Sequence, residues 1–158
     1  MDLKRLLSII ASGFGSGLSP IAPGTVGSAL AAIIYYFFIW ESVNNFLSIV
    51  FFILFIIVSF FIGIFAYSQT AEEEDPKSFV WDEFVGMWIA CIPLSLFQLE
   101  LVWLIGAFIL FRIFDIVKPF PVSYYDKNFK NSFGVIMDDV CAGLYVVAVL
   151  VLYMVITS

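Results

Sequence analysis

Long apolar stretches without charged residues alternate with short polar connectors along this chain. They cover residues 26–40, 46–66, 84–99, 101–111 and 140–156. A helix needs about 20 residues to cross the roughly 30 Å hydrocarbon core of a bilayer. The second stretch can cross unaided with its 21 residues and the last, with 17, nearly can, whereas the others borrow length from polar flanks. The pattern predicts an all-α, polytopic membrane helix bundle of about five (four to five) membrane segments.

The fourth stretch shows how polar flanks must enter the bundle. Its helix reaches about 17 residues only if it continues through Arg112 and Asp115 to Val117. Pro119 and Pro121 then end it. Because a charge that faces lipid at depth is costly, the ionisable side chains of this segment must face protein or water.

The connectors differ in charge from one side of the bundle to the other. Residues 41–45 and 98–100 contain no Lys or Arg. All seven basic residues fall on the other side of a five-helix arrangement: Lys4, Arg5, Lys77, Arg112, Lys118, Lys127 and Lys130. The positive-inside rule makes that side cytoplasmic, with the N-terminus inside and the C-terminus outside.

The remaining segments predict little further structure. Residues 1–15 begin with basic side chains, but their apolar run is too short for the hydrophobic region of a signal peptide. An amphipathic helix at the membrane interface fits better. The acidic run at residues 72–75 is most simply a solvated loop. No repeat or boundary divides the chain, so we expect one membrane-embedded domain over residues 1–158, and no pattern selects an oligomeric state.

Composition narrows the chemistry that this chain can perform. Only 13% of the residues are charged, against about a quarter in ordinary globular chains, and 63% are hydrophobic. Histidine is absent, which removes His nucleophiles, His bases and His metal ligands. Cys91 and Cys141 lie in apolar stretches without metal-ligand spacing. No basic stretch suggests nucleic acid as a partner.

A glycine-rich segment, SGFGSGLSPIAPGTVGS, covers residues 12–28 on the basic side. Its five glycines and two prolines argue against a regular helix before Pro23, which can occupy the first turn of the next helix. Free N–H groups that lead into a helix N-terminus make a phosphate cradle, with Gly24 and Thr25 as candidate contacts to the substrate phosphate. The alternative is tight helix packing through small residues.

Adjacent carboxylates open two of the apolar stretches. Asp82 and Glu83 lie in VWDEFVG, and Asp138 and Asp139 lie in FGVIMDDVCAG. Helix capping is the alternative to ligation, but it does not explain two charges at a hydrocarbon boundary. Helix neighbours diverge by about 100°. From a regular helix, both acids of the second pair therefore cannot bind the same ion. Either one acid contacts a metal ligand rather than the metal, or the pair lies at an irregular turn, or the two acids bind two different ions.

The segment FRIFDIVKPFP, residues 111–121, carries Arg112, Asp115 and Lys118 at intervals of three residues. This spacing stacks them near one helix face. A structural Arg–Asp ion pair is one interpretation. In the other, two cations around one carboxylate leave positive charge over for an anionic substrate, so Arg112 and Lys118 hold phosphate oxygens.

Together these segments supply carboxylates, cations and a glycine-rich loop on one side of the membrane. Oxygen-rich ligation without histidine indicates Mg²⁺, or Mn²⁺, rather than zinc. A hard cation, basic residues and a backbone cradle are the parts of phosphoryl chemistry. The candidate metal ligands are Asp82, Glu83, Asp115, Asp138 and Asp139. The candidate catalytic residues are Asp82, Asp115, Asp138 and Asp139.

In this order, the four segments resemble the phosphatidylglycerophosphatase A family of membrane-bound, Mg²⁺-dependent lipid phosphatases, over nearly the whole chain. The resemblance implies hydrolysis of phosphatidylglycerophosphate to phosphatidylglycerol and phosphate, in glycerophospholipid biosynthesis. It also implies Mg²⁺ as cofactor and a bacterial inner membrane, with the active site facing the cytoplasm. The motif acids show no departure from the family pattern.

The residues exclude several rival phosphatase mechanisms without that resemblance. There is no histidine, neither cysteine begins a Cys-x5-Arg loop, and no Asp-x-Asp-x-Thr/Val segment supports an aspartyl-phosphate route. Metal-activated water attacking phosphorus remains. A small Mg²⁺-binding ion carrier or channel would need polar residues through its spans. A lipid phosphotransferase of the CDP-alcohol type would need its long Asp-Gly…Asp…Asp signature, which is absent.

Overall fold

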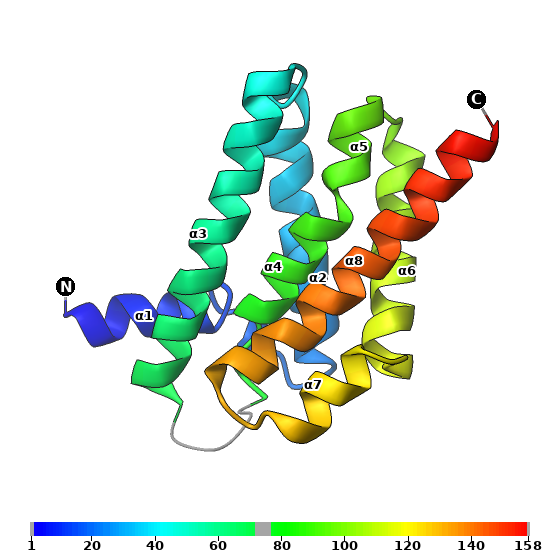
Figure 1. Cartoon of the computed structure of the whole chain (residues 1–158). Coiled ribbons are helices and arrows are strands. Elements are labelled where there is room, and N and C mark those ends of the chain that lie inside the picture. Colours follow the sequence, from blue (N-terminus) through cyan, green and yellow to red (C-terminus); the bar gives the residue numbers. More distant parts are fainter. Residues whose placement is uncertain (1, 72–76, 158) are drawn as a thin grey trace.

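The computed structural model describes residues 2–71 and 77–157, and the regular elements in these ranges are helices (Figure 1). Five segments run along one bundle: α2 (Pro23–Ile34) with the short helical turns Tyr35–Ile39 and Trp40–Ser42, α3 (Phe46–Thr70), α4 (Trp81–Ala90) with α5 (Ile92–Phe97), α6 (Leu101–Val117) and α8 (Ser132–Thr157). The all-α bundle predicted from the hydrophobic pattern is confirmed. The acidic run at residues 72–75 lies outside the described residues.

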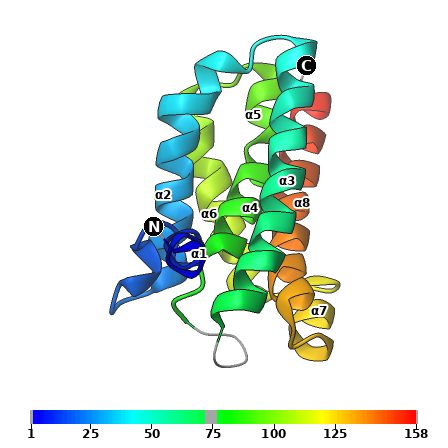
Figure 2. The same ribbon diagram turned by 90° about the vertical axis from the view of Figure 1, so that its left-hand side faces the viewer.

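The five segments alternate in direction, so the two ends of the bundle differ (Figures 1 and 2). One end carries α7 (Val122–Asn128) and the glycine-rich segment, which contains a short helical turn at Ser16–Leu18. The C-terminus lies at the other end. The helix α1 (Leu3–Ala11) lies across the bundle and packs against α3. It buries one face and exposes apolar side chains on another, as the predicted amphipathic helix should.

Within the described residues, three helices are long and apolar enough to cross a membrane: residues 23–42, 46–70 and 132–157. The helix α6 has the predicted extent, through the charged residues to Val117, and its 17 residues fall just short of that criterion. Large apolar side chains cover the outside of the bundle, with Phe38 75% and Phe46 82% exposed. Such a surface is expected where lipid replaces water.

The centre of the bundle is α4, in which every residue except Glu83 is buried. A helix that is apolar on all sides is expected in such a position. It packs closely against α8: a Cβ added at Gly143 would lie only 2.4 Å from the carbonyl oxygen of Gly86. The central position of α4 carries the acids of its first turn into the interior.

The third apolar stretch is not one helix, contrary to the simplest interpretation of its pattern. The helix α4 ends at Ala90, the chain turns at Cys91, and α5 begins at Ile92. Pro93 is the physical reason, since it has no N–H to donate and its ring clashes with the carbonyl four residues earlier.

Candidate active site

The polar parts of α2, α4, α6, α7 and α8 enclose a cavity of about 310 Å³. Six carboxylates line it: Asp82, Glu83, Asp115, Asp126, Asp138 and Asp139. Four cationic side chains also line it: Lys77, Arg112, Lys118 and Lys130. The described lining residues therefore carry a formal excess of two negative charges, which one divalent cation would balance.

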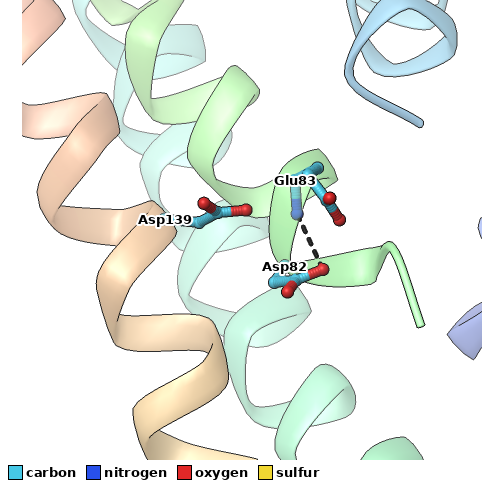
Figure 3. Close-up of side chains that lie close together, drawn as sticks. All are labelled: Asp82, Glu83 and Asp139. Atoms are coloured by element: carbon cyan, nitrogen blue, oxygen red, sulfur yellow. Dashed lines mark hydrogen bonds between the residues drawn. The ribbon is translucent and has the colours of Figure 1, made fainter. Parts of the chain in front are cut away.

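Three of the acids form a compact cluster (Figure 3). Asp82, Glu83 and Asp139 each offer one carboxylate oxygen, and these oxygens all lie within 4.8 Å of one another. Two come from the first turn of α4 and the third from α8. Figure 3 shows Asp139 reaching across from the neighbouring helix toward the pair. The closest part of α4 and α8 thus brings together acids that are far apart in the sequence.

The oxygen Oε2 of Glu83 is buried and has no hydrogen-bond partner among the described residues. A buried carboxylate oxygen without a donor is costly, so a group that supplies positive charge would stabilise it. Oxygen-only donors in a cluster of this size suit Mg²⁺ or Mn²⁺. These three acids therefore fit a hard divalent cation.

Helix capping does not account for the acid pairs. The N-cap of α4 is Val80, two residues before Asp82. In α8 the first turn is capped by Asn131, whose side-chain oxygen accepts a hydrogen bond from the backbone N–H of Gly134 at 3.0 Å. The helix starts at Ser132, so the acids at 138 and 139 lie in its second turn. The N-cap interpretation is therefore wrong for both pairs.

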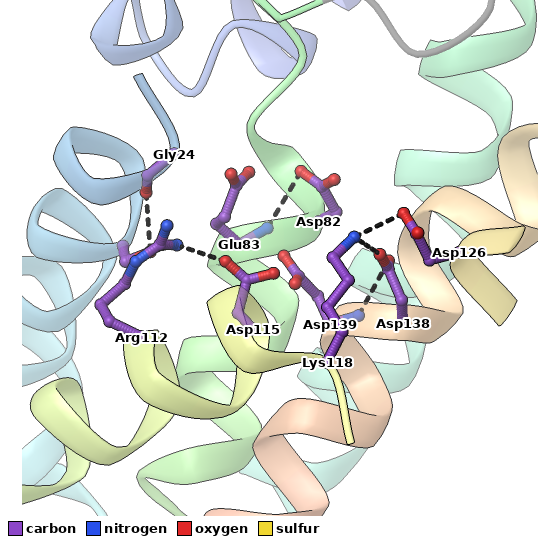
Figure 4. Close-up of polar contacts among 10 residues, drawn as sticks. Gly24, Asp82, Glu83, Arg112, Asp115, Lys118, Asp126, Asp138 and Asp139 are labelled. Atoms are coloured by element: carbon purple, nitrogen blue, oxygen red, sulfur yellow. Dashed lines mark hydrogen bonds and ion pairs between the residues drawn. The ribbon is translucent and has the colours of Figure 1, made fainter. Parts of the chain in front are cut away.

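The two acids of α8 take different partners, as their divergence around a helix requires (Figure 4). Asp139 faces the three-acid cluster, whereas Asp138 accepts a hydrogen bond from Nζ of Lys118 at 2.9 Å. Of the arrangements left open by the sequence, the irregular turn is not observed, because α8 is a regular helix at both acids.

Lys118 follows the end of α6 in the left-handed backbone conformation, with φ 49°. Like Arg112 and Asp115, Lys118 lines the cavity. Its Nζ lies 2.5 Å from Asp126 and 2.9 Å from Asp138. Burial lowers the pKa of Lys118, but the hydrogen bonds to these two carboxylates outweigh it and raise the pKa overall. Partial burial raises the pKa of Asp126, but the hydrogen bond and the positive charge of Lys118 outweigh the effect of burial, so the pKa of Asp126 is lowered overall.

Arg112 and Asp115 form the predicted ion pair, with Nη1 and Oδ2 3.0 Å apart. The same guanidinium donates to Oγ of Ser28 at 3.0 Å, and Ser28 donates to the carbonyl oxygen of Gly24 at 2.7 Å (Figure 4). Nε of Arg112 is buried without a partner among the described residues. Because Lys118 is engaged elsewhere, the predicted excess of positive charge around Asp115 is not observed.

From the glycine-rich segment, Pro23 and Gly24 line the cavity. A Cβ at Gly24 would lie 2.1 Å from Oε1 of Glu83, so a larger residue there would require this carboxylate to move. Thr25, also predicted to contact phosphate, is not among the described lining residues.

Most of the other glycines of that segment serve packing. Gly13, Gly17 and Gly27 pack against residues 78–84, and a Cβ at Gly17 would lie 2.2 Å from the carbonyl oxygen of Ser78. The packing alternative is therefore correct for these three glycines. Of the two residues predicted to contact the substrate phosphate, only Gly24 lines the cavity among the described residues.

Sequence reasoning missed Lys77, Asp126 and Lys130 as cavity residues. None belongs to the four segments, although Lys77 lies shortly before the first acid pair. Asp126 is on α7, which follows Pro121 and folds back beside α8. Only that return brings it to Lys118, so no local signal could have identified it.

Comparison with known proteins gives a consistent result. The family model described as Phosphatidylglycerophosphatase A matches residues 9–154. Phosphatidylglycerophosphatase A of Haemophilus influenzae is 40% identical over 154 residues, which cover 94% of this chain and 89% of the relative. The Escherichia coli protein of the same name is 40% identical, covering 86% and 76%. A Bacteroides thetaiotaomicron protein, provisionally named a phosphatidylinositol-3-phosphatase, is 43% identical, covering 87% and 86%. No solved structure matches the chain.

Proposed function

Because this chain belongs to the phosphatidylglycerophosphatase A family, we propose that its acid-lined cavity hydrolyses phosphatidylglycerophosphate to phosphatidylglycerol and phosphate. The enzyme is then a phosphoric monoester hydrolase of phospholipid biosynthesis. The observation that carries the proposal is the three-acid cluster, with its unpartnered Glu83 oxygen, beside fixed cationic side chains.

The proposal includes Mg²⁺, or Mn²⁺, held by Asp82, Glu83 and Asp139. Support comes from the all-oxygen donor set, the unpartnered buried oxygen and the excess of two negative charges in the lining. When bound, a divalent cation supplies a Lewis acid for phosphoryl oxygens and lowers the pKa of water. Gly24 leaves the space that the Glu83 carboxylate occupies.

The remaining lining residues divide the other tasks. Asp115 points toward Asp139 and the cluster in Figure 4, and it takes the proton of the attacking water. The water oxygen then bonds to phosphorus while the bond from phosphorus to the glycerol oxygen breaks. The proton taken by Asp115 passes to that glycerol oxygen, which leaves as the alcohol. Asp138 and Asp126 hold Lys118 as a fixed cation toward phosphate oxygens. Lys77 and Lys130, which are exposed and line the cavity, attract the anionic headgroup.

The proposed setting is a bacterial inner membrane crossed by all five segments, with the cavity toward the cytoplasm. Support comes from the alternating directions of the segments and from the position of the C-terminus at the end of the bundle away from α7. The cavity end also carries the connectors with lysine and arginine, which the positive-inside rule keeps in the cytoplasm.

The test is phosphate release from phosphatidylglycerophosphate by the purified protein in detergent, with Mg²⁺ and with EDTA. We expect release that requires the cation, and phosphatidylinositol-3-phosphate should be tested in parallel because one relative has that name. No release from phosphatidylglycerophosphate would overturn the function. Full turnover in EDTA would overturn the metal assignment alone.

A further inference from the structure

An apolar groove of about 300 Å³ runs between α2 and α6 on the outside of the bundle. It is lined by Ala29 and Ala32 of α2, by Tyr36 of the following helical turn, and by Leu104, Ile105 and Phe108 of α6. Among the lining residues, Ile105 is 57% and Phe37 70% exposed. The groove therefore opens toward the lipid that surrounds the bundle.

The two helix faces that form the groove continue into the candidate active site. Residues three or four apart share a helix face. On α6, the position four after Phe108 is Arg112, and on α2, the position four before Ala32 is Ser28. These two residues are hydrogen-bonded across the helices at 3.0 Å, and Arg112 lines the cavity. The Arg112–Ser28 contact thus separates the apolar groove from the polar cavity by about one helical turn.

We propose that this groove holds one acyl chain of the lipid substrate while the phosphorylated headgroup lies in the cavity. The inference rests on the proposed function and extends it to the recognition of the diacylglycerol part. A lipid phosphate has its charged and apolar parts joined at one point, and the Arg112–Ser28 boundary joins surfaces of the same two kinds. The guanidinium at this boundary lies next to the position where a headgroup would leave the membrane.

The dimensions agree with this occupant. The lining of α2 and the following helical turn extends from Ala29 to Phe37, about 12 Å along a helix at about 1.5 Å per residue. One leaflet contributes about half of the roughly 30 Å hydrocarbon core. The groove can therefore follow most of one chain within a leaflet. Because lipid tails are as apolar as leucine, it contributes little binding free energy and acts by orienting the substrate.

The test compares long-chain with short-chain phosphatidylglycerophosphate, in mixed micelles, for the full-length protein. Ile105→Trp fills the groove from α6, and Ala29→Trp fills it from α2. The matched control is Ile57→Trp, because Ile57 is 46% exposed and lines a separate apolar groove of about 300 Å³ between α3 and α8. We expect both groove variants to lose about ten-fold or more in kcat/KM for the long-chain lipid, with the short-chain lipid nearly unaffected. The control should match the wild type on both.

Three other outcomes would overturn the inference. The groove variants could keep the wild-type ratio of long-chain to short-chain activity, or they could lose activity equally on both substrates, which indicates damage to the site. They could also change the oligomeric state in size-exclusion chromatography while the ratio of long-chain to short-chain activity stays the same. The groove would then bind a second copy of the chain rather than an acyl chain. If the wild type hydrolyses neither substrate, the proposed function itself is wrong.

Discussion

Neighbouring acids in this protein have different roles because a helix directs them to different partners. Asp139 faces Asp82 and Glu83, while Asp138 faces Lys118. Neither acid of α8 caps the helix, since Asn131 does. The roles proposed for these acids depend on their negative charge, and substitution by Asn removes that charge while it keeps the shape of the side chain.

Asp139→Asn should lower phosphate release by at least about 10²-fold, because it removes a charge needed for ligation or proton transfer. The variant should not be less stable to heat without metal, since it removes one of several buried like charges. Raised Mg²⁺ should restore part of the activity if Asp139 is a ligand. Glu100→Gln is the control, because Glu100 lies at the far end of α6. Normal turnover of Asp139→Asn would contradict the catalytic role of the cluster.

Gly24→Ala should also reduce activity strongly, through displacement rather than lost charge. The new Cβ would lie 2.1 Å from Oε1 of Glu83, so that carboxylate must move. A displacement of about 1 Å can cost roughly 10²-fold in rate. Gly106→Ala is the matched control, since nothing lies within 4 Å of the added Cβ there. Equal activity of the two variants would show that Glu83 need not occupy its present position.

At the scale of elements, the packing of α4 against α8 assembles the acid cluster. The helices α4 and α8 approach closely at Gly86 and Gly143, and their polar parts carry the three acids. Because Pro93 breaks the helix, α4 is short and ends at Ala90. Nearly all of its residues are buried. The packing of two helices therefore sets the distance between the acids.

Gly143→Ala should destabilise the protein by about 1–3 kcal/mol, because its Cβ would meet the Gly86 carbonyl oxygen at 2.4 Å and backbone cannot easily yield. Thermal unfolding in detergent, with Gly106→Ala alongside, measures the effect. We also expect weaker Mg²⁺ dependence of stability, since the helices that carry the acids separate. An unchanged melting temperature would mean that the interface can relax at little cost.

At the scale of the whole molecule, the two ends of the bundle differ. The cavity and α7 lie at one end, and the C-terminus lies at the other (Figure 1). Three helices meet the length and composition of a membrane span, and the five-span arrangement adds α6 and the broken pair α4–α5. In the proposed five-span arrangement, the charged residues of these shorter segments must face protein or water rather than lipid.

A tag placed after Ser158 should lie outside the cytoplasm, and one inserted near Asn128, at the end of α7, should lie inside. The reason is that all seven basic residues map to one side of a five-segment arrangement. Labelling of intact and permeabilised cells distinguishes the two sides. Cytoplasmic labelling at both positions would rule out five crossings.

The sequence by itself determined the helical bundle, the extent of α6, the start of α2 at Pro23 and the acids that line the cavity, apart from Asp126. These follow from local physics: apolar length, proline geometry and the cost of charge in lipid. Only the tertiary structure decided which acids meet, that Lys118 turns to Asp126 and Asp138, and that most glycines of the first segment pack rather than bind. Those outcomes depend on the approach of α4 to α8 and on the return of α7. Contacts between distant residues depend on how whole helices pack, and hydrophobic periodicity does not record that packing.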